Sequence, residues 1–285
     1  MNYTIANEQL TVTISDRGAE LQSVKGTDGR ERIWQGDPAV WGRRSPVLFP
    51  LCGRTYEGKS TADGIPCDLP LHGLFQDRVC AVRQIGAQEI AFTQEAGPDT
   101  LSRYPYPFRV ELVYRLSGNT LTVSATVTNP GDRAMHYAYG AHPGFALYGP
   151  LEDYRARFGK KQAVRVVNFT PDCRFPTGGS SPFPLENGDC IPLSEAQFAV
   201  GSFFLCEMPD SVTLLRGETP VVTLSYPGFR YLGFWKVAGA PFLCIEPWYS
   251  MPARKGEILE LSARADFLHL PAGHSETYAY SMTFR

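Results

Sequence analysis

Glu246 is the only carboxylate in an apolar, strand-like run, Phe242–Trp248. In an extended backbone its side chain lies on the same face as Cys244 and Trp248. Partial desolvation there disfavours the charged carboxylate unless donors or cations compensate, and such a group can be tuned into a general base. The structural alternative is a glutamate at a strand edge that pairs with an arginine, because ion-pair networks also produce such residues.

His142 stands between small residues and directly before a proline, in the segment Tyr137–Phe145. The proline favours an extended backbone at His142. Gly140 and Gly144 leave room around the imidazole, and histidine is the side chain best suited to exchange a proton near neutral pH. His142 is therefore a candidate general acid or base, with a partly buried structural histidine as the alternative.

A third polar stretch, between Ser45 and Asp77, contains Arg54 and His72. The guanidinium is a rigid fork of donors and the imidazole is a second titratable ring, so either can hold the hydroxyl groups of a ligand. A surface arginine and a histidine in a turn are the plainer interpretations of the same residues.

The four tryptophans are candidate stacking platforms for a sugar ring, although most tryptophans belong to cores. Trp248 is the best placed because it neighbours Glu246. We expect Trp248 and Trp235 to contact the ligand, and the other two candidates are Trp34 and Trp41.

Motifs for other chemistries are missing or fail a physical test. The five histidines include no H-E-x-x-H pair and no cysteine stands at zinc spacing from them, so we expect neither a metal nor a cofactor. There is no serine-nucleophile elbow and no dinucleotide fingerprint. Residues 53–60 match the phosphate-binding P-loop pattern, which works only when a helix begins at its lysine. Gly64, Pro66 and Pro70 forbid a helix of useful length, so we reject nucleotide binding.

The elements that must position these residues are predicted to be β-strands. The 27 glycines and 23 prolines cut the chain into pieces too short for long helices. Apolar residues alternate along 110–116 and 121–127, on either side of a Gly118-Asn119 turn, which predicts a hairpin. The same period at residues 10–14 and 278–284 predicts a strand near each end.

We therefore expect an all-β fold, a large antiparallel β-sandwich, in which residues 1–285 form one domain. The absence of alternating helices argues against a βαβ fold. A short turn after Asp37-Pro38 is expected, and Leu259–Leu268 is ambiguous between helix and strand. The stretch Thr170–Pro192, rich in Pro, Gly and Ser, is predicted to be a long surface loop of the kind that often borders a site.

The bulk composition limits the partners and the compartment. A formal charge of −2 provides no field to hold DNA or an anionic membrane, and no apolar run is long enough to cross a bilayer. The N-terminus shows no export signal, and the seven cysteines, scattered without a C-x-x-C pair, are predicted to be reduced thiols. We expect a cytoplasmic protein that binds a small molecule; the oligomeric state leaves no signal in the sequence.

Taken together, these segments resemble the aldose 1-epimerase (galactose mutarotase-like) family, and most closely its bacterial LacX-like branch. Their order and spacing cover nearly the whole chain, and the H-P and I-E-P-W pieces in this order are the most specific. The matching segments are Trp41 with Ser45-Pro46-Val47-Leu48-Phe49-Pro50 and Gly53-Arg54; Leu71-His72-Gly73 with Asp77; Asn129 with Gly140-Ala141-His142-Pro143-Gly144-Phe145; and Tyr231-Leu232-Gly233-Phe234-Trp235 with Cys244-Ile245-Glu246-Pro247-Trp248.

The resemblance implies a β-supersandwich with an open cleft, a sugar substrate and a cofactor-free acid/base mechanism. By motif, Glu246 corresponds to the base that removes the proton from the C1 hydroxyl, and His142 to the acid that protonates the ring oxygen. The ring then opens, the C1–C2 bond rotates, and closure gives the other anomer. Arg54 and His72 fall on positions that bind sugar oxygens in the family.

Two positions depart from the family pattern. Galactose mutarotases carry an acidic, sugar-gripping residue between the histidine and the glutamate, and none stands around Ala199–Phe204. We therefore expect an aldose substrate without strong selection for the galactose C4 hydroxyl. Gln76 stands where relatives have an arginine, which removes a positive charge near His72.

Two other functions fit the same fold. A hexose-6-phosphate 1-epimerase shares the acid/base pair but needs extra cations for the phosphate, for which Arg43 and Arg44 are candidates. A non-catalytic carbohydrate-binding or sugar-sensing protein needs aromatic and hydrogen-bonding groups only. The presence of both His142 and Glu246 argues against a pure binder, because binding requires no acid/base couple.

Overall fold

The predicted hairpin lies in the middle of the largest sheet. β9 (Arg109–Ser117) and β10 (Thr120–Thr128) bury alternate residues, so one face of each strand belongs to the core. Gly118, with a φ of +56°, begins the turn between them. On its other side β10 pairs antiparallel with the predicted C-terminal strand, β25 (Ser275–Phe284). The computed structural model describes residues 1–285.

This sheet has nine strands, and the neighbours of each strand pair antiparallel to it. Its order is β17 (Cys190–Pro192), β14 (Tyr154–Phe158), β19 (Ser211–Arg216), β20 (Thr219–Ser225), β25, β10, β9, β8 (Glu89–Glu95) and β7 (Ala81–Gly86).

The second large sheet has eight strands, and its strand β22 is buried along all seven residues. A strand covered on both faces carries a nearly continuous apolar run, which is the pattern of Phe242–Trp248. The order is β16 (Pro176–Phe183), β15 (Val164–Phe169), β18 (Ser202–Cys206), β21 (Tyr231–Trp235), β22 (Phe242–Trp248), β12 (Gly140–Ala141) and β4 (Val47–Leu48), with β13 (Gly144–Ala146) also paired to β22.

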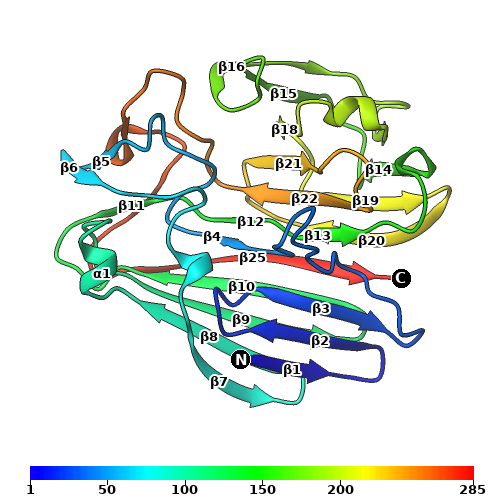
Figure 1. The fold of residues 1–285 in the computed structure, drawn as a ribbon, viewed down its shortest axis with the longest axis horizontal. Coiled ribbons are helices and arrows are strands. Elements are labelled where there is room, and N and C mark those ends of the chain that lie inside the picture. The colour runs from blue at the N-terminus through cyan, green and yellow to red at the C-terminus, as the bar shows by residue number, and fades with distance from the viewer.

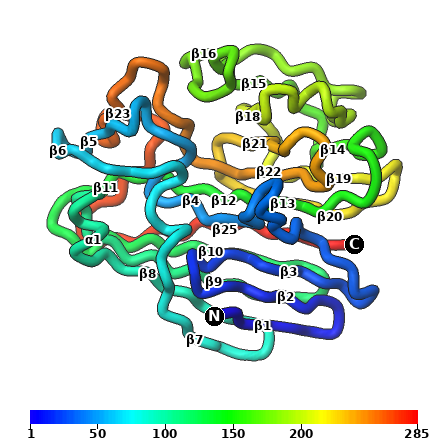
Figure 2. Tube along the Cα trace, viewed as in Figure 1, coloured from blue at the N-terminus to red at the C-terminus, as the bar shows by residue number.

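From β14 to β25 the chain passes back and forth between the two large sheets, as the green to red part of the trace shows in Figure 2. Their facing side chains belong to one core cluster of 72 buried residues. Tyr139 and Tyr278, for example, stack with ring centroids 5.5 Å apart. The protein is thus an all-β antiparallel sandwich, as predicted (Figure 1).

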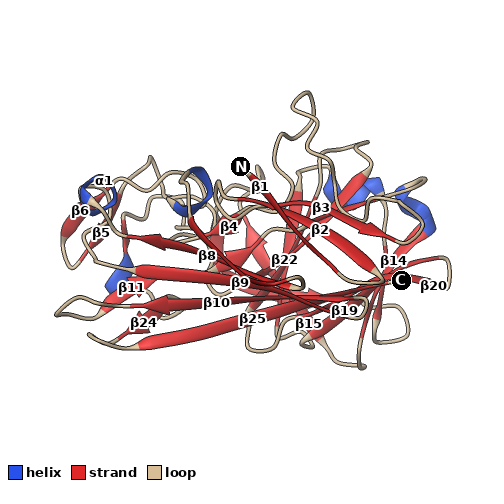
Figure 3. Ribbon diagram, turned by 90° about the horizontal axis from the view of Figure 1, so that it is seen from below, coloured by secondary structure: helices blue, strands red, loops and turns tan.

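A three-stranded sheet near the N-terminus covers part of the nine-stranded sheet (Figures 1 and 3). The Tyr3 ring packs against Phe92 at 6.0 Å, and the Tyr114 hydroxyl donates to the Ala19 carbonyl oxygen at 2.6 Å. Two more small sheets complete the set. The strands of the three sheets are β1 (Asn2–Ala6), β2 (Leu10–Ser15) and β3 (Leu21–Gly26); β11 (Met135–Tyr137) and β24 (Leu268–Leu270); and β23 (Leu259–Glu260), β5 (Ser60–Ala62) and β6 (Ile65–Cys67).

Helices are confined to single turns, and none has both the length and the apolar character needed to span a membrane. The ambiguous segment from Leu259 divides into a two-residue strand and a 3₁₀ turn. All seven cysteines are unpaired, as predicted. The helical turns are α1 (Pro98–Leu101), η1 (Phe75–Asp77), η2 (Leu151–Asp153), η3 (Glu195–Phe198) and η4 (Leu261–Ala263).

The prediction of one long loop over Thr170–Pro192 is wrong, because β16 and β17 lie within it. Both are edge strands of their sheets, where a proline costs no ladder hydrogen bond, so Pro176 and Pro182 do not prevent strand formation. Elsewhere the local predictions are confirmed. Residues 53–60 contain no helix, and Trp41 N–H donates to the Asp37 carbonyl oxygen at 2.8 Å in the predicted turn.

Candidate active site

The six candidate site residues surround one cavity of about 540 Å³. They come from β21, β22, the link between β12 and β13, the segment between β4 and β5, and the segment between β6 and η1. Trp41, predicted as a stacking platform, lines the same cavity, whereas Trp34 packs in a small cluster with Phe242 and Cys244 outside it. The six residues are Arg54, His72, His142, Trp235, Glu246 and Trp248.

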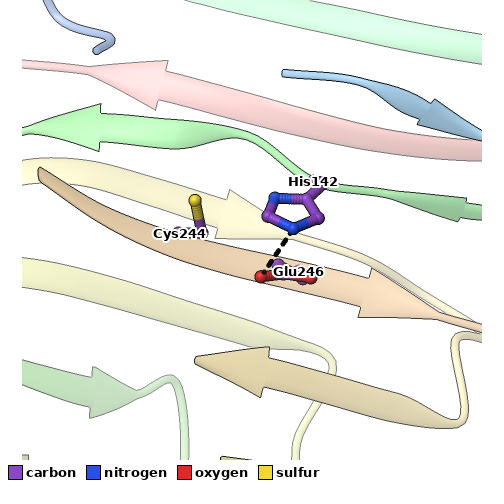
Figure 4. A group of neighbouring side chains, drawn as sticks. All are labelled: His142, Cys244 and Glu246. Carbon is purple, nitrogen blue, oxygen red and sulfur yellow. Dashed lines mark ion pairs between the residues drawn. The ribbon is translucent and has the colours of Figure 1, made fainter. Parts of the chain in front are cut away.

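Strand pairing places His142 opposite Glu246. Gly140 of β12 pairs with Trp248, and Gly144 of β13 pairs with Cys244, so the link between the two short strands faces the middle of β22. His142 Nε2 lies 3.3 Å from Glu246 Oε1 (Figure 4). The Glu246 residue is 1 % exposed and His142 is 7 % exposed.

The two glycines beside His142 permit this close approach. A Cβ atom on Gly140 would lie 2.8 Å from Cys52 Sγ, and one on Gly144 would lie 3.1 Å from Trp41 Cζ3. The first distance is shorter than real side-chain contacts and the second is tighter than most of them, so a larger residue at either position would crowd its neighbours. The glycines therefore let Cys52 and Trp41 pack closely against the segment that carries His142.

Burial moves both members of the pair toward their uncharged forms. Desolvation lowers the pKa of His142 to about 3 and raises the pKa of Glu246 well above its usual range. The neighbouring Trp248 side chain lowers the pKa of Glu246, but this effect is smaller than that of desolvation. Neither carboxylate oxygen of Glu246 has a hydrogen-bond partner. A neutral imidazole beside a carboxylic acid and an imidazolium beside a carboxylate hold the same number of protons and differ only in which group carries the one that moves, so the pair can pass that proton across 3.3 Å.

Aromatic rings enclose the imidazole of His142. The ring centroids of Trp41, Trp235 and His72 lie 5.1, 5.5 and 5.4 Å from it. Trp41 is tilted by 32° against the imidazole, and the other two rings meet it edge to face. This apolar enclosure is the physical cause of the desolvation.

His72 is fixed from the backbone. Its N–H donates to the Gly53 carbonyl oxygen at 2.7 Å, and its Nδ1 accepts from Gly53 N–H at 3.1 Å. Burial and the nearby His142 and Arg54 lower the pKa of His72 well below its usual value, so the ring is neutral with its proton on Nε2. Arg54, which follows Gly53 in the chain, is exposed at the cavity and forms no ion pair.

Glu20 supports the cavity wall from outside, which the sequence analysis missed. Its Oε1 accepts from the backbone N–H groups of Arg44 and Ser45 at 2.7 and 3.1 Å. The Arg44 carbonyl oxygen in turn accepts from Gly144 N–H at 2.9 Å. The buried Glu20 therefore connects the segment that follows Trp41 to the strand beside His142.

Both arginines considered as phosphate ligands are engaged elsewhere. Arg43 pairs with Glu20 and Asp77, and Arg44 Nη1 donates to Gln22 Oε1 at 2.8 Å. Arg43 also lines the cavity, but its charge is already balanced by the two carboxylates.

The turn between β15 and β16 lies at the rim of the cavity, in the stretch Thr170–Pro192 that was expected to border a site, although none of its residues was singled out. Asp172, Cys173 and Arg174 line the cavity there, and Arg174 Nε lies 3.9 Å from Asp172 Oδ2. Asp172 thus places a carboxylate at the rim. It stands well before Ala199–Phe204, the segment in which the family pattern led us to look for an acidic residue. Its exposure leaves no local sequence signal that would mark it as part of a site.

Cys244 completes a small cluster with the central pair. Its thiol, His142 and Glu246 offer three ligand-type atoms within 4.8 Å of one another (Figure 4). Cys244 and Glu246 are two residues apart on β22 and share a face, as predicted, while His142 comes from a distant segment. A search for short metal-ligand spacings cannot find a set divided in this way.

Known proteins support the fold and the family. The aldose 1-epimerase family matches residues 1–190. The chromosomal LacX protein of Lactococcus lactis subsp. lactis is 28% identical over an alignment of 288 residues, gaps included. The alignment covers 91% of this chain and 92% of LacX.

Two solved structures are similar along the entire chain. A galactose mutarotase related enzyme from Lactobacillus acidophilus is 28% identical with a TM-score of 0.93, and the match covers 100% of this chain and 97% of that one. A galactose mutarotase-like protein from Lactobacillus casei is 27% identical with a TM-score of 0.94, and the match covers 100% of both chains. The family match extends over more than half of the chain, and this protein therefore belongs to the aldose 1-epimerase family.

Proposed function

We propose that this protein is an aldose 1-epimerase, a single-domain enzyme that interconverts the α and β anomers of an unphosphorylated aldohexose. The observation that carries the proposal is the contact between His142 Nε2 and Glu246 Oε1 at the base of a cavity lined by tryptophans. Anomer exchange needs one proton removed from the C1 hydroxyl and one delivered to the ring oxygen. A pair that holds one mobile proton can do both.

Glu246, as the carboxylate, takes the C1 hydroxyl proton, and His142, as the imidazolium, protonates the ring oxygen. The C1–O5 bond breaks, rotation about C1–C2 turns the aldehyde, and the reverse transfers close the ring on its other face. The site is uncharged before the sugar binds, and moving the shared proton from Glu246 to His142 creates the reactive form. Sugar oxygens that hydrogen-bond to the charged groups favour this transfer.

The wall of the cavity suits a pyranose. Trp41, Trp235 and Trp248 line the cavity and offer apolar surface for the C–H groups of the ring. Arg54 supplies donors that form no ion pair, and the neutral His72 supplies an Nε2–H donor, so both can hold hydroxyl oxygens. A mixed wall of rings and donors is typical of small-molecule sites.

The phosphosugar alternative is less well supported. A phosphate needs cations that are free to pair with it. The carboxylates of Glu20 and Asp77 already occupy Arg43, which leaves Arg54 as the one arginine of the cavity without an ion pair. Arg174 lies at the rim but faces Asp172. We therefore infer a neutral sugar.

Saturation-transfer NMR on the anomeric protons of free and phosphorylated aldoses tests the proposal directly. We expect enzyme-dependent exchange with glucose and galactose, without strong discrimination between them, and slower exchange with glucose 6-phosphate. Glu246→Gln and His142→Asn should each lower kcat by about 10²- to 10⁴-fold with little change in sugar binding. Glu8→Gln, at an exposed glutamate, is the matched control.

The outcomes separate the three functions. A large preference for the phosphosugar would identify a hexose-6-phosphate 1-epimerase. Sugar binding without any enzyme-dependent exchange would identify a carbohydrate-binding protein. If either folded variant kept more than about a tenth of the wild-type rate, its assignment would be wrong.

A further inference from the structure

We infer that His142, Cys244 and Glu246 also form a binding site for a soft divalent cation of the Zn²⁺ class, and that the bound cation switches the enzyme off. The inhibition rests on the proposed function, but the binding does not. The cation would act as an inhibitor that competes with the sugar, and the catalytic steps would not use it.

The geometry is close to that of a three-ligand zinc site. The three ligand atoms lie within 4.8 Å of one another, and the nitrogen and oxygen are already 3.3 Å apart. Zinc bonds of about 2.0 to 2.3 Å in a tetrahedron place ligand atoms about 3.3 to 3.7 Å apart. Closing the set therefore requires the most distant pair of atoms to approach by roughly 1 to 1.5 Å, chiefly through movement of the Cys244 thiol.

The donor types select the metal. One sulfur, one imidazole nitrogen and one carboxylate oxygen suit Zn²⁺, whereas Mg²⁺ and Ca²⁺ prefer sets made of oxygen atoms. His142 and Glu246 line the cavity and Cys244 does not, so the fourth coordination position points toward the cavity. A water molecule can occupy it, as in zinc sites with three protein ligands.

The electrostatics of the site favour a cation. Both oxygens of Glu246 are buried without a hydrogen-bond partner, although carboxylates at such depth are normally paired or bound to a metal. His142 Nδ1 also has no hydrogen-bond partner. No arginine or lysine pairs with Glu246, whose one ionic contact is with His142.

Protons balance on binding. Zn²⁺ displaces the thiol proton of Cys244 and the carboxyl proton of Glu246, both of which go to solvent, while the neutral His142 binds through Nε2. The complex carries no net charge. Affinity should therefore fall as the pH falls, as for other sites with thiolate ligands.

The same atoms cannot serve a metal and a sugar at once. A cation on Nε2 of His142 and on the Glu246 carboxylate removes the mobile proton and occupies the space of the C1 hydroxyl and the ring oxygen. Zinc should consequently raise the apparent KM for the sugar, and a chelator should restore the rate.

Binding is measured without turnover. Co²⁺ serves as a spectroscopic substitute for Zn²⁺, and isothermal titration calorimetry with Zn²⁺ measures affinity. In the wild type we expect one equivalent bound, with tetrahedral Co²⁺ bands and a thiolate-to-metal charge-transfer band. Cys244→Ser should remove the charge-transfer band and weaken Zn²⁺ binding by at least about tenfold.

A cysteine outside the cluster provides the matched control. Cys206→Ser changes a half-buried cysteine on β18 and should bind both metals like the wild type. Glu246→Gln should keep the charge-transfer band and weaken affinity, so the test stands even if Cys244→Ser does not fold. Unchanged Zn²⁺ binding in folded Cys244→Ser, or a wild type that binds no Co²⁺ or Zn²⁺, would overturn the inference.

The two proposals fail separately. An active mutarotase that neither binds Zn²⁺ nor responds to it would contradict the metal site alone. A protein that binds Zn²⁺ through Cys244 but exchanges no anomers would contradict the proposed function and leave the metal site intact.

Discussion

Gly53 and His72 hold each other through two reciprocal hydrogen bonds. The His72 backbone N–H donates to the Gly53 carbonyl oxygen, and the Gly53 N–H donates to His72 Nδ1. His72 has a φ of +65°, a left-handed conformation that asparagine tolerates better than most residues. The arrangement assigns the ring proton to Nε2 and makes His72 a donor at the cavity.

His72→Asn should therefore fold normally and bind the sugar less tightly. The asparagine oxygen can replace Nδ1 as the acceptor for Gly53, but its shorter side chain withdraws the donor from the cavity. Loss of one hydrogen bond to a ligand costs about 1 kcal/mol, so we expect the KM to rise about five- to tenfold with a smaller effect on kcat. Steady-state polarimetry checks this.

His274→Asn, at an exposed histidine outside the cavity, is the control and should leave both constants unchanged. An equal loss in kcat with no change in KM would instead place His72 in the chemical step, and the donor role assigned to it here would be wrong.

The pH dependence of the rate should reflect the single shared proton. The pair loses its reactive form at low pH, where His142 and Glu246 are both protonated, and at high pH, where both are deprotonated. Because burial lowers the pKa of His142 to about 3, kcat/KM should stay level as the pH falls through the usual histidine range. It should fall at alkaline pH, above the raised pKa of Glu246.

Polarimetry in weak buffers, with the enzyme-free rate subtracted at each pH, measures this profile. An acid limb near 6.5, the usual pKa of histidine, would show that His142 titrates like an exposed ring. That result would contradict the desolvated pair.

Some parts of the fold and of the site can be predicted from the sequence, and others cannot. The alternation of residues in β9, β10 and β25 reports burial directly, and an apolar run with one carboxylate singles out Glu246, so the sandwich and the central residues are predictable. The supporting role of Glu20 is not, because it acts on backbone N–H groups 24 and 25 residues away. Backbone contacts at that separation depend on the complete fold and leave no residue pattern.

The burial of Glu246 should also cost stability in a pH-dependent way. Its pKa is raised in the folded state, so its favourable contribution is fully present below the ordinary glutamate pKa and is lost as the pH rises through the folded-state value. Glu246→Gln removes the titration but keeps the shape. The variant and the wild type should thus have similar Tm values near pH 4, and the variant should become the more stable by a few °C toward neutral pH.

Differential scanning calorimetry across this range provides the measurement. Glu8→Gln, at an exposed position, should show no such divergence. A wild type that is equally stable or more stable than Glu246→Gln at neutral pH would mean that the folded protein compensates the carboxylate fully.

Glu246→Gln and His142→Asn should be strongly non-additive in kcat. If the two groups share one proton, removing either one disables the transfer, and removing the second has little left to remove. Each single variant should lose about 10²- to 10⁴-fold, and the double variant should lose much less than the product of the two. Residual catalysis then comes from binding and orientation by the cavity wall. The cycle is measured by polarimetry in weak buffer, with circular dichroism to establish that all three variants fold. Losses that multiply would mean that the two residues act independently, and the contact at 3.3 Å would then have no part in a shared proton transfer.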